Sequence, residues 1–141
     1  MTNTAPKWIL IAGIALILWN LTGSIMFVLD MTKTPEDLVA LPQDQQKLWA
    51  QMPAWAWAAY GVGTIGGLLA AIGIVIRKKW AAHLALLSVV AIIVNFYPAF
   101  FMSEGVDVWQ PKFFVFPLVI FVIALLQLWL ARTANQRGWS R

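Results

Sequence analysis

Long apolar stretches alternate with short polar connections along the chain. Four stretches, residues 8–29, 53–76, 80–102 and 113–131, contain no Asp, Glu, Lys or Arg. Each is 19 to 24 residues long. A helix rises about 1.5 Å per residue, so each stretch is long enough to cross a hydrocarbon core of about 30 Å. The sequence therefore predicts an all-α membrane protein with four transmembrane helices.

The connections between these stretches predict how the helices are arranged. Only residues 77–79 separate the second stretch from the third, and residues 103–112 separate the third from the fourth. Short connections make consecutive helices antiparallel neighbours, so we expect an up-down-up-down four-helix bundle. No linker or low-complexity tract divides residues 1–141, which we interpret as a single transmembrane domain.

The one long connection, residues 30–52, contains helix signals of its own. Residues 34–37 (Thr-Pro-Glu-Asp) are typical of a helix start, because Thr caps free amides, Pro suits the first helical position and acids favour the first turn. After an interruption at Pro42, residues 43–52 mix polar residues with a few apolar ones, which predicts a short helix lying on the outer membrane surface. The alternative is a lid over a cavity that faces outward.

Charge is unevenly distributed over the two faces that four spans create. The face with both termini carries seven positive charges and no acid, whereas the opposite face carries three positive and six negative charges. The topology determinants are Arg77, Lys78 and Lys79, in the turn between spans two and three. Because Lys and Arg near span ends resist translocation, both termini are predicted to be cytoplasmic. This topology and the lipid bilayer account for the net charge of +4, so no nucleic-acid partner is expected.

A cleaved signal peptide is the rival interpretation of the first stretch, because Lys7 precedes an apolar run. That run is longer than a typical signal-peptide core, and no small-x-small cleavage site follows it at Leu29–Asp30. We therefore expect a retained first span.

Residues that the sequence lacks exclude several activities. The chain has no cysteine and one histidine, which excludes a disulfide framework, a cysteine-ligated metal and a bis-histidine haem site within one copy. Spans without acids offer no carboxylate for proton-coupled export, and no nucleotide loop or catalytic triad is present. We therefore expect a protein that is not an enzyme and has no cofactor and no metal.

Span two is rich in small residues. Gly63 and Gly67 form a small-x-x-x-small pair, and Gly66 lies beside them. In lipid, such residues let helix backbones approach closely and gain van der Waals contact. This face can pack inside the bundle, against span one or span three, or it can form a homodimer contact.

Candidate binding residues come from the few polar and aromatic side chains within the spans. Of the nine tryptophans, all but Trp19 lie near predicted span ends, where amphipathic rings act as anchors. Counting at about 1.5 Å per residue from the span ends places a group of side chains in the middle and outer half of the membrane. The candidate lining is Trp19, Asn20, Tyr60, Thr64, Asn95 and Tyr97. Rings that stack and amides that exchange hydrogen bonds suit a small neutral polar solute, although the same residues can instead fix the bundle through interhelical hydrogen bonds.

Four short motifs add a comparison with known sequences. They are Trp19-Asn20-x-x-Gly23, Met52-Pro53-x-Trp55, Gly66-Gly67 and Arg77-Lys78-Lys79-Trp80. In these motifs the chain resembles a group of poorly characterised bacterial four-span membrane proteins that are often labelled sugar transporters. The resemblance covers roughly residues 5–102. It implies a bacterial inner membrane and a role in handling a solute.

Two functional hypotheses of different classes follow. The first is an inner-membrane protein that binds or transports a small neutral, sugar-like solute, in which case four spans are few and a homo-oligomer is expected. The second is a non-catalytic accessory or structural subunit, which docks a larger membrane complex through the glycine-rich second span.

Overall fold

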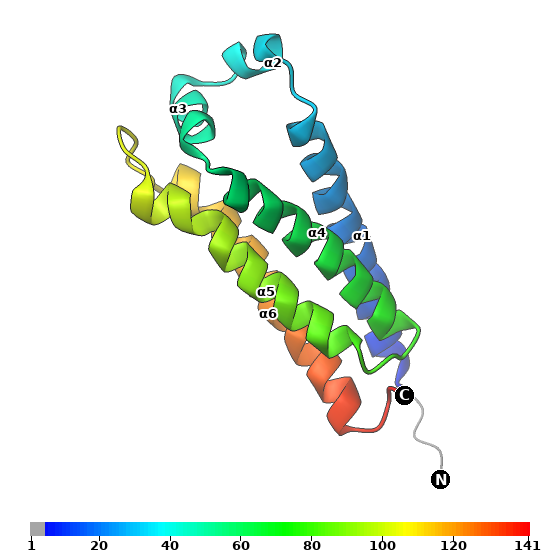
Figure 1. Cartoon of the computed structure of the whole chain (residues 1–141). Helices are drawn as coiled ribbons and strands as arrows, with labels where there is room; N and C mark the ends of the chain where they lie inside the picture. The colour runs from blue at the N-terminus through cyan, green and yellow to red at the C-terminus, as the bar shows by residue number, and fades with distance from the viewer. Residues whose placement is uncertain (1–4) are drawn as a thin grey trace.

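The computed structural model describes residues 5–141, which are mostly helical and contain no strand within that range (Figure 1). The four helices that are long and apolar enough to span a membrane are α1 (Lys7–Met31), α4 (Ala54–Val75), α5 (Ala81–Tyr97) with its π-helical continuation η1 (Pro98–Met102), and α6 (Pro111–Gln136). They run alternately up and down, which confirms the predicted four-helix membrane bundle. The chain is therefore a multi-pass membrane protein that sits in a lipid bilayer.

Helices α1 and α6 extend beyond their predicted apolar stretches, most of all at the carboxyl end of α6, whereas α4 and α5 with η1 stay within theirs. The fourth stretch was expected over residues 113–131, whereas α6 continues to Gln136. Residues 132–136 are mainly polar, so hydropathy does not register them, yet nothing in them breaks a helix. The apolar stretch thus marks the part that crosses lipid and not the whole helix.

Helix α4 forms the centre of the bundle. It packs along α1 on one side and along α5 on the other, and α6 packs mainly against α5. Half of the apolar part of α4 is buried within the chain, against 17% for α1 and for α6. The outer helices therefore present most of their apolar surface to lipid.

The glycines of α4 make this central position possible. A Cβ atom added at Gly61 would lie 2.8 Å from the ring of Phe27 in α1, and one at Gly63 would lie 3.3 Å from Ile92 in α5. Gly66 and Gly67 are buried as well. The small-residue face thus packs inside the chain, against both spans one and three, because only a missing side chain allows two helices to approach so closely.

The end of the bundle that carries the start of α1, the carboxyl terminus and the Arg77–Lys79 turn is closed (Figure 1); we call it the basic end. Its core consists mostly of alanines from α4, α5 and α6, packed around Ile9 of α1. The carboxyl-terminal tail folds over it, because the Nε of Arg77 donates to the Trp139 carbonyl at 2.8 Å. The ring of Trp139 also meets that of Trp8 at a centroid distance of 6.2 Å. The basic end is therefore tightly packed.

The opposite, or loop, end carries α2 (Pro35–Val39) and α3 (Gln43–Gln51). Thr34 caps α2 as expected: its hydroxyl accepts from the Asp37 amide at 3.2 Å, and its own amide donates to the Asp37 carboxylate at 2.9 Å. These hydrogen bonds hold the pKa of the Asp37 carboxyl below its usual range. The side chain of Gln51 pairs with the Glu104 backbone through two hydrogen bonds, which ties α3 to the α5–α6 connection.

Candidate functional site

A cavity of about 540 Å³ lies between the four long helices, in the half of the bundle towards the loop end; we call it the deep chamber. Its deepest lining residues are Trp19 in α1, Thr64 in α4, Ser88 in α5 and Gln127 in α6, and all its other lining residues lie closer to the loop end. It forms where α1 and α6 stay apart, while the glycine face holds α4 close to α1 and α5. The polar lining residues are Asn20, Thr22, Asp30, Tyr60, Thr64, Ser88, Asn95 and Gln127.

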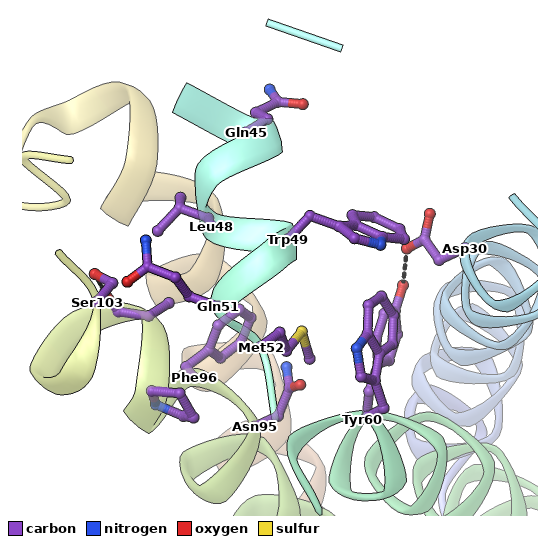
Figure 2. A pocket seen from close by; sticks show the side chains of 13 residues that line it. Asp30, Gln45, Leu48, Trp49, Gln51, Met52, Tyr60, Asn95, Phe96 and Ser103 are labelled. Carbon is purple, nitrogen blue, oxygen red and sulfur yellow. Dashed lines mark hydrogen bonds between the residues drawn. The ribbon is translucent and has the colours of Figure 1, made fainter. Parts of the chain in front are cut away.

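A second cavity of about 260 Å³, the outer chamber, lies between α3 and the loop ends of α4 and α5 (Figure 2). Trp49 and Met52, from α3 and its end, form part of its wall. The two chambers adjoin, because Asp30, Tyr60 and Asn95 line both of them. Helix α3, the short helix predicted between spans one and two, therefore covers the outer chamber at the loop end.

The floor of the deep chamber is a hydrogen-bonded amide network. The Nδ2 of Asn20 donates to the Oε1 of Gln127 at 2.7 Å and to the Leu16 carbonyl at 2.8 Å. The Nε2 of Gln127 donates to the Gly67 carbonyl at 2.8 Å, and the Gln127 side chain is buried. A Cβ atom at Gly67 would overlap the Asn20 amide, so only glycine leaves room for this arrangement. The amide nitrogen of Asn20 is thus engaged in holding α1, α4 and α6 together.

Tyr60 connects the deep chamber with the loop end. Its hydroxyl donates to the Asp30 carboxylate at 2.9 Å, and its ring lies 5.0 Å from the ring of Phe27. The Thr64 hydroxyl, one turn away, donates within its own helix to the Tyr60 carbonyl at 3.1 Å. Both side chains line the deep chamber, and both hydroxyls already donate their hydrogens to acceptors within the chain.

Asn95 differs from these residues because its side chain is not satisfied. Its Oδ1 is the one buried side-chain polar atom without a hydrogen-bond partner among residues 5–141. Figure 2 shows this side chain reaching towards Met52 in the outer chamber. Leaving a buried amide oxygen unpaired costs about 1–3 kcal/mol, so such an atom is usually satisfied by water or by a ligand.

One candidate residue lies elsewhere. Tyr97 lines neither chamber; it is 49% exposed, and its ring stacks on Phe101 at 5.2 Å. Two positions after Asn95, a side chain points about 200° away around the helix, so Tyr97 faces the lipid side of α5. Trp19 does line the deep chamber, where its ring meets that of Phe116 of α6 at 6.4 Å.

Sequence reasoning missed four polar residues that line the deep chamber: Thr22, Asp30, Ser88 and Gln127. Gln127 lies nine residues before the end of α6, or about 14 Å along the helix, and therefore deeper than the apolar stretch ending at 131 suggested. Asp30 counted as part of a connection, yet it is the last acid before α1 ends and its carboxylate turns inward to Tyr60. Extending the predicted first and fourth spans into their polar flanking residues would have placed Asp30 inside α1 and Gln127 well before the end of α6.

Comparison with family models, with curated proteins and with solved structures gave no match to this chain. Residues 5–141 also hold no cluster of three or more His, Asp or Glu side chains that could bind a metal ion. Fold and site together thus define a four-span membrane protein that is closed at the basic end and has two adjoining chambers towards the loop end.

Proposed function

We propose that this chain is a bacterial inner-membrane protein, with both termini in the cytoplasm, that binds a small neutral polar solute in its two chambers and serves in its transport. The observation that carries the proposal is Asn95, which lines both chambers and whose buried amide oxygen has no hydrogen-bond partner among residues 5–141. An amide in that position suits a hydroxyl group of a sugar-like solute, because its oxygen can accept the hydrogen bond that no protein group donates. The orientation and the location rest on the charge distribution and on the resemblance.

The size and lining of the deep chamber support this proposal. Its volume of about 540 Å³ lies within the range of about 300–1,000 Å³ that is usual for small-molecule sites. Trp19, Phe96 and Phe116 supply aromatic surface, on which an apolar face of a sugar ring can stack. A few amides and hydroxyls in a mainly apolar wall are the composition expected for binding an uncharged ligand.

One end of the bundle is tightly packed and the other contains the chambers, which indicates the end at which a solute would enter. The alanine core and the carboxyl-terminal tail close the basic end, while both chambers lie towards the loop end. In the proposed orientation the loop end faces outward, so the solute enters from outside, beneath α3. A carrier would need a second conformation in which the basic end opens.

The accessory-subunit hypothesis has less support. It needs a small-residue surface on α4 that is free to meet a partner, but Gly63, Gly66 and Gly67 are buried between α4 and its neighbours in the same chain. A mild-detergent pull-down of the tagged protein distinguishes the two hypotheses. The solute hypothesis expects a monomer or homo-oligomer, whereas a discrete complex with other proteins would favour the subunit.

The direct test is to measure, by calorimetry, the binding of glycerol, xylitol and glucose to the protein in lipid nanodiscs. We expect at least one of these probes to bind, and Asn95→Leu to weaken that binding about tenfold, as the loss of one buried hydrogen bond does. Asn135→Leu is the matched control, because Asn135 lies at the basic end and bonds to the Lys79 carbonyl. Unchanged binding by the Asn95 variant, or no binding of any probe, would contradict the proposal.

A further inference from the structure

Two kinds of tryptophan surround the loop end. Trp55 and Trp109 are 48% and 60% exposed, as interfacial anchors are. Trp49 and Trp57 are instead partly buried and line the outer chamber. Their rings meet at 4.7 Å and 61°, which makes an aromatic corner. Anchoring in the headgroup region does not require this inward arrangement.

A carboxylate completes this corner. The Trp57 ring stacks on Tyr60 at 6.1 Å with only 16° between their planes, and the Tyr60 hydroxyl bonds to Asp30. Figure 2 shows Asp30 beside the Trp49 ring, above Tyr60. Aromatic faces next to a carboxylate attract a positive charge, because the ring quadrupole is negative on its face.

The chain already places a cation at this position. The ammonium of Lys33 lies 3.0 Å from Asp30 and 5.6 Å from the centroid of the Trp49 ring. The side chains of Lys33 and Asp30 are only 23% and 16% exposed, so this pair is partly removed from water. Lys33 itself does not line the outer chamber, and thus its ammonium meets the corner at the rim.

We propose that Asp30, Trp49, Trp57 and Tyr60 form a binding site for a methylated ammonium group, with Lys33 as a tethered competitor. A methylated ammonium is weakly hydrated and has few or no donors, so it depends on ring faces and a nearby carboxylate more than on hydrogen bonds. The connections at this end carry six acids and three lysines, a balance that draws cations to the mouth. This site lies in the outer chamber, through which the proposed neutral solute would also pass, but it is tested at Lys33, Asp30 and Trp49, whereas the neutral-solute proposal is tested at Asn95.

The test is a titration of the protein with tetramethylammonium chloride, in nanodiscs of phosphatidylglycerol. Binding is measured by tryptophan fluorescence, and a titration with sodium chloride at equal ionic strength is the blank. Lys33→Met removes the competitor, and we expect tighter binding by about fivefold or more, since a site that its own lysine occupies is only partly available. Adding Asp30→Asn or Trp49→Leu to Lys33→Met should weaken binding by about fivefold or more. Thermal melting of each variant shows whether it is folded.

Lys112→Met is the matched control. Lys112 also pairs with an acid, Asp44 at 3.8 Å, and lies 5.1 Å from the centroid of the Phe113 ring, but it lines neither chamber. We expect its removal to leave tetramethylammonium affinity unchanged. The proposal is overturned if Lys33→Met binds no more tightly than the unmodified chain, or if Lys112→Met has the same effect, which would indicate surface charge alone.

The natural methylated ammonium has two possible sources, a free organic cation or a choline lipid headgroup. Repeating the titration in nanodiscs that contain phosphatidylcholine separates them. Weaker tetramethylammonium binding there would identify the headgroup as the occupant, and equal binding would exclude the headgroup and leave a free cation as the source. Both results agree with the proposed chemistry, which the variants test separately.

Discussion

Replacing Asn20 by Leu tests whether the floor of the deep chamber holds the bundle together. The change removes the donor that bonds to Gln127 at 2.7 Å and to the Leu16 carbonyl at 2.8 Å. Gln127 is 3% exposed, so its Oε1 would be left without a partner and without water. The change therefore creates an unpaired acceptor inside the bundle as well as removing a hydrogen bond.

The expected cost follows from these contacts. Interhelical hydrogen bonds in membranes contribute about 0.6 kcal/mol on average and up to about 1.7 kcal/mol. Because Gln127 is buried, we expect Asn20→Leu to lower the free energy of unfolding by about 1.5 kcal/mol, near the upper value. Gln127→Leu should cost about as much. The double variant should cost about 1 kcal/mol less than the two single costs combined, because it leaves neither amide unpaired.

The measurement is reversible unfolding in mixed detergent–SDS micelles, followed by circular dichroism, for the four members of this double-mutant cycle. Thr22→Val is the control, because Thr22 lines the same chamber but its hydroxyl bonds only to the Leu18 carbonyl of its own helix. It should change stability by no more than about 0.5 kcal/mol. Costs of Asn20→Leu and Gln127→Leu that simply add would refute the reasoning, because bonded residues must be coupled.

Three further predictions concern other parts of the chain. Gly67→Ala should destabilise the protein by about 1–3 kcal/mol, because the added Cβ would overlap the floor network. Gly66→Ala should be tolerated, since a Cβ added there would lie 4.0 Å from the nearest atom, the Leu84 carbonyl oxygen. Thermal melting in detergent compares the two variants. Hydrogen bonds lower the pKa of Asp37 in the folded chain, so their contribution to the stability of α2 is present above the unfolded pKa and is lost as pH falls below about 4. The amide chemical shifts of α2 should change in that pH range. An impermeant thiol reagent should label Gln43→Cys in intact cells, but Gln136→Cys only after permeabilisation.

The helices and their order could be predicted because they depend on local signals. Apolar runs long enough to cross lipid define the four spans, and the Thr-Pro-Glu-Asp sequence at 34–37 defines the start of α2. Short connections then leave little choice of topology. These features need no knowledge of which side of a helix faces which neighbour.

The candidate site could be predicted only in part, because depth along a helix says nothing about rotation around it. Asn95 and Tyr97 lie at similar depths, yet one borders both chambers and the other faces lipid. That rotation is set by packing against the glycine face of α4, which involves residues far apart in the sequence. The bond between Asn20 and Gln127 joins the first and last spans, and no local pattern indicates it.

Thiol labelling of Asn95→Cys is the most direct test of the central claim, that a chamber reaches Asn95 from the loop end while the basic end is closed. The chain has no cysteine of its own, so a single introduced thiol reports one position. Ala131→Cys is the control, since Ala131 is 1% exposed in the core of the basic end. The account predicts that a small impermeant reagent added at the loop face modifies Asn95→Cys and leaves Ala131→Cys unmodified. An unreactive thiol at position 95, or equal reaction at both positions, would contradict it.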